Sequence, residues 1–245
     1  MSSRAGNFSS SEIHRLMSKG RGNWSLENVG APFTSYVQEK VYERRLGRAL
    51  SQKQNSRSTS WGTFVEKRVF DLLSMKYKLI SQDRYSHPTI KNWNGMPDIL
   101  TRDKQVVGDI KSNWALKSFC ELVDVLEQNS WEALKEARPE YYWQLVSNSI
   151  LTGAPKAELI VYVPFKGELE AIKEMANKHS FDGKLDENDV AFINFAADSE
   201  LPHLIEGEGY NNLYSYTWEV AESEKQLLTE RVKMASEILT EKTKK

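Results

Sequence analysis

The chain has 245 residues, of which 40% are hydrophobic, enough to bury a sizeable core in one large domain or one domain with appendages. It has no run of about 18 apolar residues and its first segment lacks the apolar stretch of a secretory signal, so we expect a soluble cytoplasmic protein without a membrane span. The single cysteine, Cys120, excludes an internal disulfide, and four scattered histidines offer no zinc-ligand spacing. Any metal must therefore be held mainly by oxygen.

Charge is distributed unevenly along the chain. Residues 1–60 carry ten Lys and Arg against four Asp and Glu, although the net charge of the whole chain is only −1. The near-neutral total argues against a protein that coats nucleic acid indiscriminately, whereas a basic N-terminal quarter is suited to local phosphate binding. A merely basic, solvated surface is the alternative, and charge alone does not choose between them.

Apolar spacing and capping signals predict three helices in the first third of the chain. Residues 9–19 begin with Ser9 and Glu12 in capping-box spacing. A second helix is expected over residues 32–46, ending at a glycine, and a third from residue 61 to about residue 77. The polar tract 50–60 between the last two is expected to be an exposed loop.

Strand patterns follow the third helix. We expect short strands at residues 78–82, 97–101 and 105–111, the last two joined by a hairpin turn. The rest of the chain then predicts, in order, helices 116–126 and 140–151, strand 158–163, helix 167–178, strands 190–195 and 213–220, and helix 222–242. This order indicates a single α/β domain with a mixed central sheet flanked by helices.

Two aspartates and a lysine lie on either side of the predicted turn. The segment GMPD ends at Asp98, and GDIK, ten residues later, contains Asp109 and Lys111. On a strand, Asp109 and Lys111 project from the same face. Phosphodiester hydrolysis needs an activated water and neutralisation of the phosphate, which carboxylate-bound Mg²⁺ provides. Asp98 and Asp109 are thus candidate metal ligands, the Ile110 carbonyl a further one, and Lys111 a candidate to orient or deprotonate the water or to stabilise charge.

Two helical side chains extend this candidate site. Glu66, in the third predicted helix, falls among apolar residues and is a candidate third carboxylate. Gln144, in helix 140–151, lies on a polar stripe and is a candidate to orient the water or a phosphate oxygen. The residues alone leave plainer interpretations open: an Asp–Lys ion pair on a solvated hairpin, a solvated Glu66, and a solvent-facing stripe around Gln144.

Taken together these segments resemble the phage lambda-exonuclease family, also called the YqaJ-like viral recombinases, within the PD-(D/E)XK nuclease superfamily. The similarity spans about residues 4–164, and its pieces occur in the family's order: RAGNFSSSEI, WGTFVE, PDIL, GDIK, YYWQLVSNSILTG and VYVP. The resemblance implies a restriction-endonuclease-like core. We expect a single nuclease domain over residues 1–245, with a basic, helical DNA-end-binding segment (1–60), a catalytic core (61–165) and C-terminal strands with a long helix (166–245).

The resemblance also implies roles for individual residues. Asp98, Asp109 and Glu66 would be the metal-binding carboxylates, Lys111 the catalytic lysine and Gln144 the active-site glutamine. Arg4 and Ser11 match the pair that holds a 5′ phosphate in lambda-type enzymes, in agreement with the basic N-terminal segment. Asp109 stands where lambda-type members have Glu, which preserves the charge on a shorter arm.

The function implied is Mg²⁺-dependent digestion of linear double-stranded DNA from its ends, 5′ to 3′, with Mn²⁺ as a substitute metal. It would leave 3′ single strands for a single-strand annealing protein, in phage-type recombination inside a bacterial host, and the enzyme would be a ring-shaped homotrimer around DNA. One alternative is an endonuclease or a Cas4/RecB-like nuclease without an iron-sulfur cluster, which one cysteine could not hold. Another is a catalytically silent module that binds DNA ends.

Overall fold

The protein was analysed as a computed structural model, which describes residues 5–50, 56–73, 83–178 and 187–244. Its centre is a four-stranded mixed sheet in the order β4-β5-β6-β7. The strands are β4 (Ile99–Leu100), β5 (Val106–Lys111), β6 (Lys156–Tyr162) and β7 (Leu213–Glu219). Because β5 and β6 are parallel while the two outer pairs are antiparallel, the predicted mixed sheet is confirmed.

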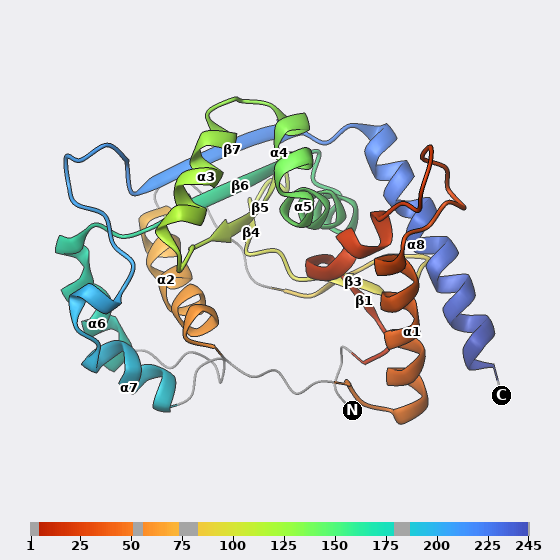
Figure 1. Cartoon of the computed structure of the whole chain (residues 1–245), viewed down its shortest axis with the longest axis horizontal. Coiled ribbons are helices and arrows are strands. Elements are labelled where there is room, and N and C mark those ends of the chain that lie inside the picture. The colour runs from red at the N-terminus through yellow and green to blue at the C-terminus, as the bar shows by residue number, and fades with distance from the viewer. Residues whose placement is uncertain (1–4, 51–55, 74–82, 179–186, 245) are drawn as a thin grey trace.

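Helices cover both faces of this sheet, because apolar side chains of β6 point alternately to one face and to the other. Leu159 and Val161 of β6 join one apolar cluster, and Ile160 and Tyr162 join a second one on the opposite face. The first face packs against η1 (Ser10–Met17), α1 (Ala31–Leu46), α3 (Leu116–Leu126), α4 (Trp131–Ala137), α5 (Pro139–Thr152) and α8 (Glu222–Thr243). The second packs against α2 (Arg57–Leu73), α6 (Leu169–Lys178) and α7 (Glu187–Phe195), which form a separate group in Figure 1.

A second, smaller sheet joins the N-terminus to the middle of the chain. It consists of β1 (Phe8–Ser9), β3 (Trp93–Gly95) and β2 (Tyr85–Ser86), in the order β1-β3-β2. The indole N–H of Trp93 donates to the hydroxyl of Ser147 on α5 across 2.9 Å. A Cβ at Gly95 would collide with the side chains of η1 and α5, so only glycine allows this close packing. The small sheet therefore holds the N-terminal segment against α5.

Several predicted elements were wrong or displaced. Residues 190–195 were expected to form a strand but lie in α7, and the segment expected to be a helix from residue 9 is β1 followed by the 3₁₀ helix η1. The expected loop 50–60 was wrong at its end, because α2 already begins at Arg57. The hydroxyl of Ser56 accepts the backbone N–H of Thr59 across 3.2 Å, in the manner of an N-cap. Helix α4 was not predicted at all.

The remaining predicted elements occur with boundaries shifted by a few residues. The helix 116–126 matches α3, and the helix 140–151 matches α5. The strand predicted at 78–82, and the part of the third helix beyond residue 73, lie outside the described residues. None of the helices in the described ranges combines the length and the apolar character needed to cross a membrane.

Candidate active site

The site is built on β5, which carries both Asp109 and Lys111 on one face. Asp109 is only 1% exposed, and Ile110 between them points into the cluster on the opposite face. A carboxylate this deeply buried needs polar partners, since an uncompensated buried charge is costly. The partners are Lys111 on the same strand and Gln144 on α5.

Asp98 reaches the site across the β4–β5 hairpin. It lies directly before β4, and its Oδ2 accepts the backbone N–H of Ile110 across 2.8 Å. The hairpin pairs Ile99 with Gly108, which brings the two aspartates together although ten residues separate them. This juxtaposition is the one that the sequence predicted.

Gln144 on α5 connects the members of the site. Its Nε2 donates to Oδ1 of Asp109 across 2.6 Å, and its Oε1 accepts from Nζ of Lys111 across 3.3 Å. The Lys111 ammonium also forms a close ion pair with Oδ2 of Asp109. In addition, it lies 4.9 Å from the ring centre of Tyr141, the residue three positions before Gln144 on the same helix face.

The electrostatics show an excess of negative charge around one lysine. Burial raises the pKa of Asp98 well above its usual value, and the charges of Asp109 and Glu66 raise it further, against an opposing effect of Lys111. Burial lowers the pKa of Lys111, but the charges of the two aspartates outweigh burial, so the net shift is upward. Glu66, on α2, is thus close enough to act on Asp98 through its charge.

This donor set fits a hard divalent cation. Asp98 and Asp109 repel each other, and a bound Mg²⁺ would relieve this repulsion. In proteins Mg²⁺ keeps several waters and binds to few protein oxygens. Among the described residues no group of three or more His, Cys, Asp and Glu side chains is placed to hold a metal. The structure therefore offers Asp98 and Asp109 as the pair of ligands, and the roles of Glu66 and the Ile110 carbonyl as further ligands stay predictions.

The predicted phosphate-binding residues are only partly described. Arg4 lies outside the described residues. Ser11 is exposed near the start of η1. Its neighbour Ser10 is bonded to Ser147, hydroxyl to hydroxyl, across 2.8 Å, and Ser147 lies three residues after Gln144 on α5. The start of η1 is thus fixed to the helix that carries the active-site glutamine.

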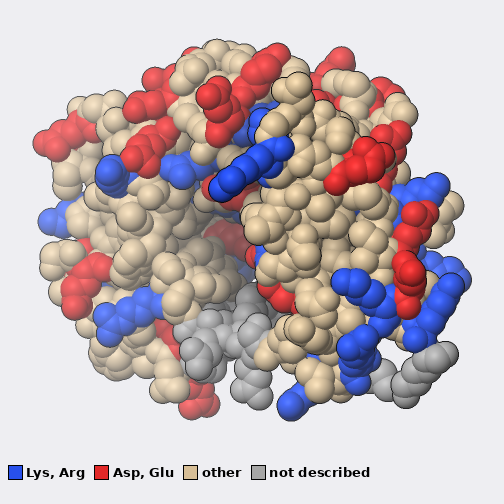
Figure 2. Space-filling model, turned by 45° about the vertical axis from the view of Figure 1, so that its right-hand side comes forward, with Lys and Arg blue, Asp and Glu red and all other residues tan. Residues whose placement is uncertain are grey.

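Two further residues support the site, and one of them, Ser147, was missed in the sequence. Ser147, fully buried, joins η1, α5 and β3, and Tyr141 contacts the Lys111 ammonium. Tyr141 belongs to the polar stripe that the sequence showed around Gln144, but no role was predicted for it. The pattern of α5 alone does not indicate the contact between Ser147 and Ser10. Figure 2 shows that one face of the molecule is hollowed near its centre, with acidic side chains inside the hollow and lysines and arginines along its rim.

An aspartate directly before β4, a second aspartate on the neighbouring strand β5, a lysine two positions after it, and a mixed sheet flanked by helices are the arrangement of the PD-(D/E)XK class of fold. The chain is similar to the crystal structure of an alkaline exonuclease (LHK-Exo) from Laribacter hongkongensis, with a TM-score of 0.62, 16% identity, and coverage of 98% of this chain and 91% of that one. A second structure of LHK-Exo, in complex with dAMP, matches equally well.

A phage-related exonuclease from Haemophilus somnus 129PT is also similar, with a TM-score of 0.60, 13% identity, and coverage of 96% of this chain and 94% of that one. No protein-family model matches the chain, and no curated protein matches it by sequence. At these identities the likeness establishes the fold. It confirms the fold class that the resemblance implied, a restriction-endonuclease-like core with a mixed sheet flanked by helices.

Proposed function

We propose that this chain is a metal-dependent DNA exonuclease that digests linear double-stranded DNA. The observation that carries the proposal is the group formed by Asp98, Asp109, Lys111 and Gln144, on a fold shared with two exonucleases. One LHK-Exo structure contains dAMP, and this supports the proposal that a protein of this fold can bind a deoxynucleotide.

The residues would divide the chemistry as follows. Asp98 and Asp109 would hold Mg²⁺, which when bound supplies charge neutralisation at the phosphate and a more acidic water. Lys111, whose pKa is raised, is a charged ammonium that would orient the attacking water and stabilise the charge building on the phosphate oxygens. Gln144 would hold the Asp109 and Lys111 side chains in a fixed position relative to each other, because it is hydrogen-bonded to both.

End recognition would come from the N-terminal segment. Arg4 and Ser11 would bind the 5′ phosphate, so that digestion proceeds 5′ to 3′ and leaves a 3′ single strand. The remaining parts of the proposal are a homotrimeric ring, transfer of the single strand to an annealing protein, and a role in phage-type recombination in the bacterial cytoplasm. They are supported by the resemblance stated above.

The test is digestion of 5′-phosphorylated linear duplex in Mg²⁺, with one strand labelled at its 3′ end and the other at its 5′ end. We expect mononucleotide release from the 5′ end, loss of activity in EDTA, and no cutting of covalently closed circular duplex. Intact linear DNA after incubation with the wild-type protein would refute the proposal. Cutting of closed circles would instead identify an endonuclease, and binding of ends without cleavage would identify a silent end-binding module.

A further inference from the structure

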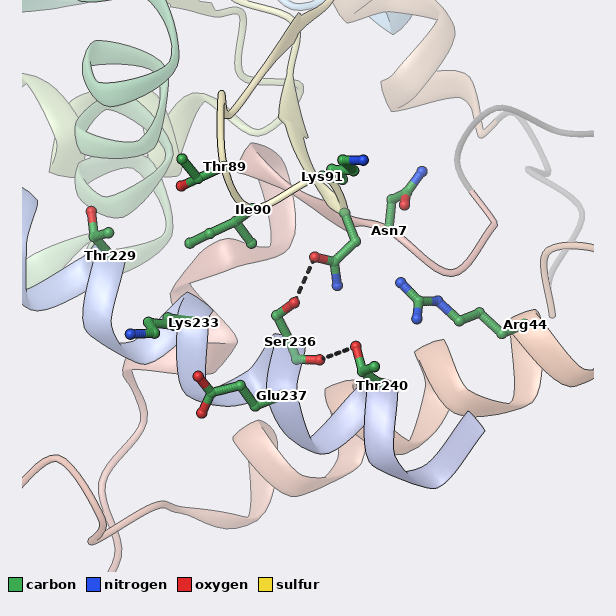
Figure 3. Close-up of a pocket in the computed structure, with 11 residues that line it drawn as sticks. Asn7, Arg44, Thr89, Ile90, Lys91, Thr229, Lys233, Ser236, Glu237 and Thr240 are labelled. Carbon is green, nitrogen blue, oxygen red and sulfur yellow. Dashed lines mark hydrogen bonds between the residues drawn. The ribbon is translucent and has the colours of Figure 1, made fainter. Parts of the chain in front are cut away.

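A polar pocket of about 740 Å³ lies on the side of the molecule formed by α1, α8 and the small sheet, apart from the aspartates. Its walls include Arg44 from α1, Lys91 and Asn92 from the turn before β3, and Lys233 and Ser236 from α8. Figure 3 shows the Arg44 side chain extending into the pocket, with Lys91 and Lys233 on different sides of it. The pocket thus gathers basic side chains from three parts of the sequence.

The basic residues of this pocket are available to a ligand. Within the described ranges, none of Arg44, Lys91 and Lys233 takes part in an ion pair, although many other lysines and arginines of the chain do. Burial lowers the pKa of Arg44, and its Nε donates only to the Gly6 carbonyl, across 3.3 Å. Of the acidic residues, only Glu237 lines the pocket, so the described lining has an excess of positive charge.

Asn92 adds a fixed, unused donor to the wall. Its side chain is oriented by Ser236, whose hydroxyl donates to Oδ1 of Asn92 across 2.8 Å. Asn92 is only 6% exposed, and its Nδ2 has no hydrogen-bond partner. A buried donor without a partner is destabilising, so a ligand that accepts from it is favoured. An anionic oxygen in the pocket would satisfy this donor and the basic side chains together.

The chain runs from the wall of the pocket through β3 to Asp98. Asn92 points to Ser236 on α8, whereas the next residue, Trp93, points the opposite way, to Ser147 on α5. Asp98 follows Asn92 by six residues, so their Cα atoms lie within about 22 Å of each other. Along the axis of B-form DNA, one strand has a phosphate about every 3.4 Å, so this upper limit spans at most about six phosphates.

From this geometry we propose that the pocket binds a phosphodiester group in the backbone of the DNA duplex, within about six nucleotides of the bond that is cleaved. The proposal rests on the proposed function, because it takes the duplex as the substrate of the site at Asp98 and Asp109. Lys91 and Lys233 supply charge, and Asn92 supplies a directed hydrogen bond to a phosphate oxygen. Such a contact has no base specificity and fixes the position of the duplex relative to the catalytic strands.

The experiment compares duplex binding by the wild-type protein, the double variant Lys91→Ala/Lys233→Ala and the control Lys117→Ala/Lys225→Ala. The control removes the same charge, but from lysines that are already paired with Glu121 and Glu222. Affinity for a 5′-phosphorylated duplex is measured by fluorescence anisotropy in EDTA, where no cleavage occurs, over a series of salt concentrations. We expect the double variant to bind roughly tenfold more weakly near 0.1 M salt, with a salt slope smaller by about 2.

Asn92→Asp provides a second, nearly isosteric test, because it replaces the free donor with a charged acceptor while Ser236 can still donate to it. We expect weaker duplex binding and an unchanged melting temperature within a few degrees. The same affinity and salt slope in the wild type, the double variant and the control would overturn the proposal. So would a loss of binding for free dAMP alone, since that result assigns the pocket to a mononucleotide.

These results are distinguishable from a failure of the proposed function. If the wild-type protein digests duplex DNA but the pocket variants bind it normally, only the pocket assignment fails. If the wild-type protein neither binds nor digests duplex DNA, the proposed function fails, and the pocket assignment fails with it.

Discussion

The side-chain amide of Gln144 donates to Asp109 across 2.6 Å and accepts from Lys111 across 3.3 Å. Through these two hydrogen bonds it links α5 to β5. The amide occupies one oxygen of the buried carboxylate, and the ammonium occupies the other. This relationship gives Gln144 a positioning role for two groups at once.

Gln144→Ala is expected to lower kcat by about 10–100-fold, the range typical of residues that orient a metal ligand. KM for the duplex should change little, because Gln144 acts on Asp109 and Lys111 rather than on distant parts of the DNA. Steady-state kinetics on a labelled linear duplex measure both constants. A variant with normal kcat and raised KM would show that Gln144 binds DNA and does not position the catalytic groups.

Lys111→Met is expected to reduce cleavage by about 10²–10⁴-fold, because it keeps the length of the side chain but removes the charge that stabilises the phosphate. Duplex affinity in EDTA should remain within a few-fold of the wild-type value. The control Lys117→Met removes an exposed charge on α3. Equal activity of the two variants would contradict a catalytic role for Lys111.

Metal binding can be measured without activity. Mg²⁺ or Mn²⁺ is expected to raise the melting temperature of the wild-type protein, because a cation relieves the repulsion among Asp98, Asp109 and Glu66. At a metal concentration 100 times Kd the gain is about 2.7 kcal/mol. Asp98→Asn should abolish this gain and should also stabilise the metal-free protein, since it removes the carboxylate that burial and its neighbours disfavour.

The matched control for that experiment is Asp103→Asn, which changes an exposed aspartate in the turn of the same hairpin. This variant should keep the metal-dependent rise in melting temperature. If Asp98→Asn also keeps the rise, the cation binds elsewhere. If Asp98→Asn destabilises the metal-free protein, the repulsion argument is wrong.

The sequence predicted the parts of the site that depend on local pattern. A short strand with alternating side chains places Asp109 and Lys111 on one face, and a tight turn returns the chain to Asp98, so nearby residues are sufficient for this prediction. Ser147 was missed because its partner Ser10 is 137 residues away. No periodicity in one segment indicates such a contact.

The element that was predicted with the wrong type shows a different limit. The run VAFINF at residues 190–195 is apolar enough for a buried strand but too short to exclude a helix. In α7 only Ile193 is buried, and Phe195 is 88% exposed. Glu187 and Asp189 in the first turn favour a helix through its dipole, and Asp189 also accepts a hydrogen bond from Ser60 on α2 across 2.5 Å. Tertiary contacts with α2 and α6 thus decide the structure of this segment.

Ser11→Ala is expected to reduce the preference for 5′-phosphorylated over 5′-hydroxyl ends, because it removes a hydroxyl from the proposed end-binding segment. Its effect should be smaller than that of Arg4→Ala, since a guanidinium contributes charge as well as hydrogen bonds. Initial rates on the two kinds of duplex end measure the preference. Ser223→Ala, which changes an exposed serine on α8, serves as the control, and an equal loss in both variants would remove the specific role of Ser11.

The Arg15–Glu39 pair, which holds η1 against α1, predicts a pH dependence of stability. The two side chains make two hydrogen bonds, at 2.9 and 2.6 Å, and the hydrogen bond from Arg15 lowers the pKa of Glu39 below its ordinary value of 4.5. A carboxyl group with a lowered pKa in the folded state contributes stability above the unfolded pKa, and this contribution disappears as the pH falls through the folded pKa.

Glu39→Gln is therefore expected to destabilise the protein at pH 7 but to have little effect near pH 3. Because the Glu39 side chain is 37% exposed, solvent screening limits the loss to below about 1 kcal/mol. Urea unfolding of both proteins at the two pH values measures the difference, with Glu241→Gln as an exposed control. A loss that is equal at both pH values would mean that the ion pair does not cause it. A loss that is larger in acid would reverse the sign of the linkage and contradict the lowered pKa.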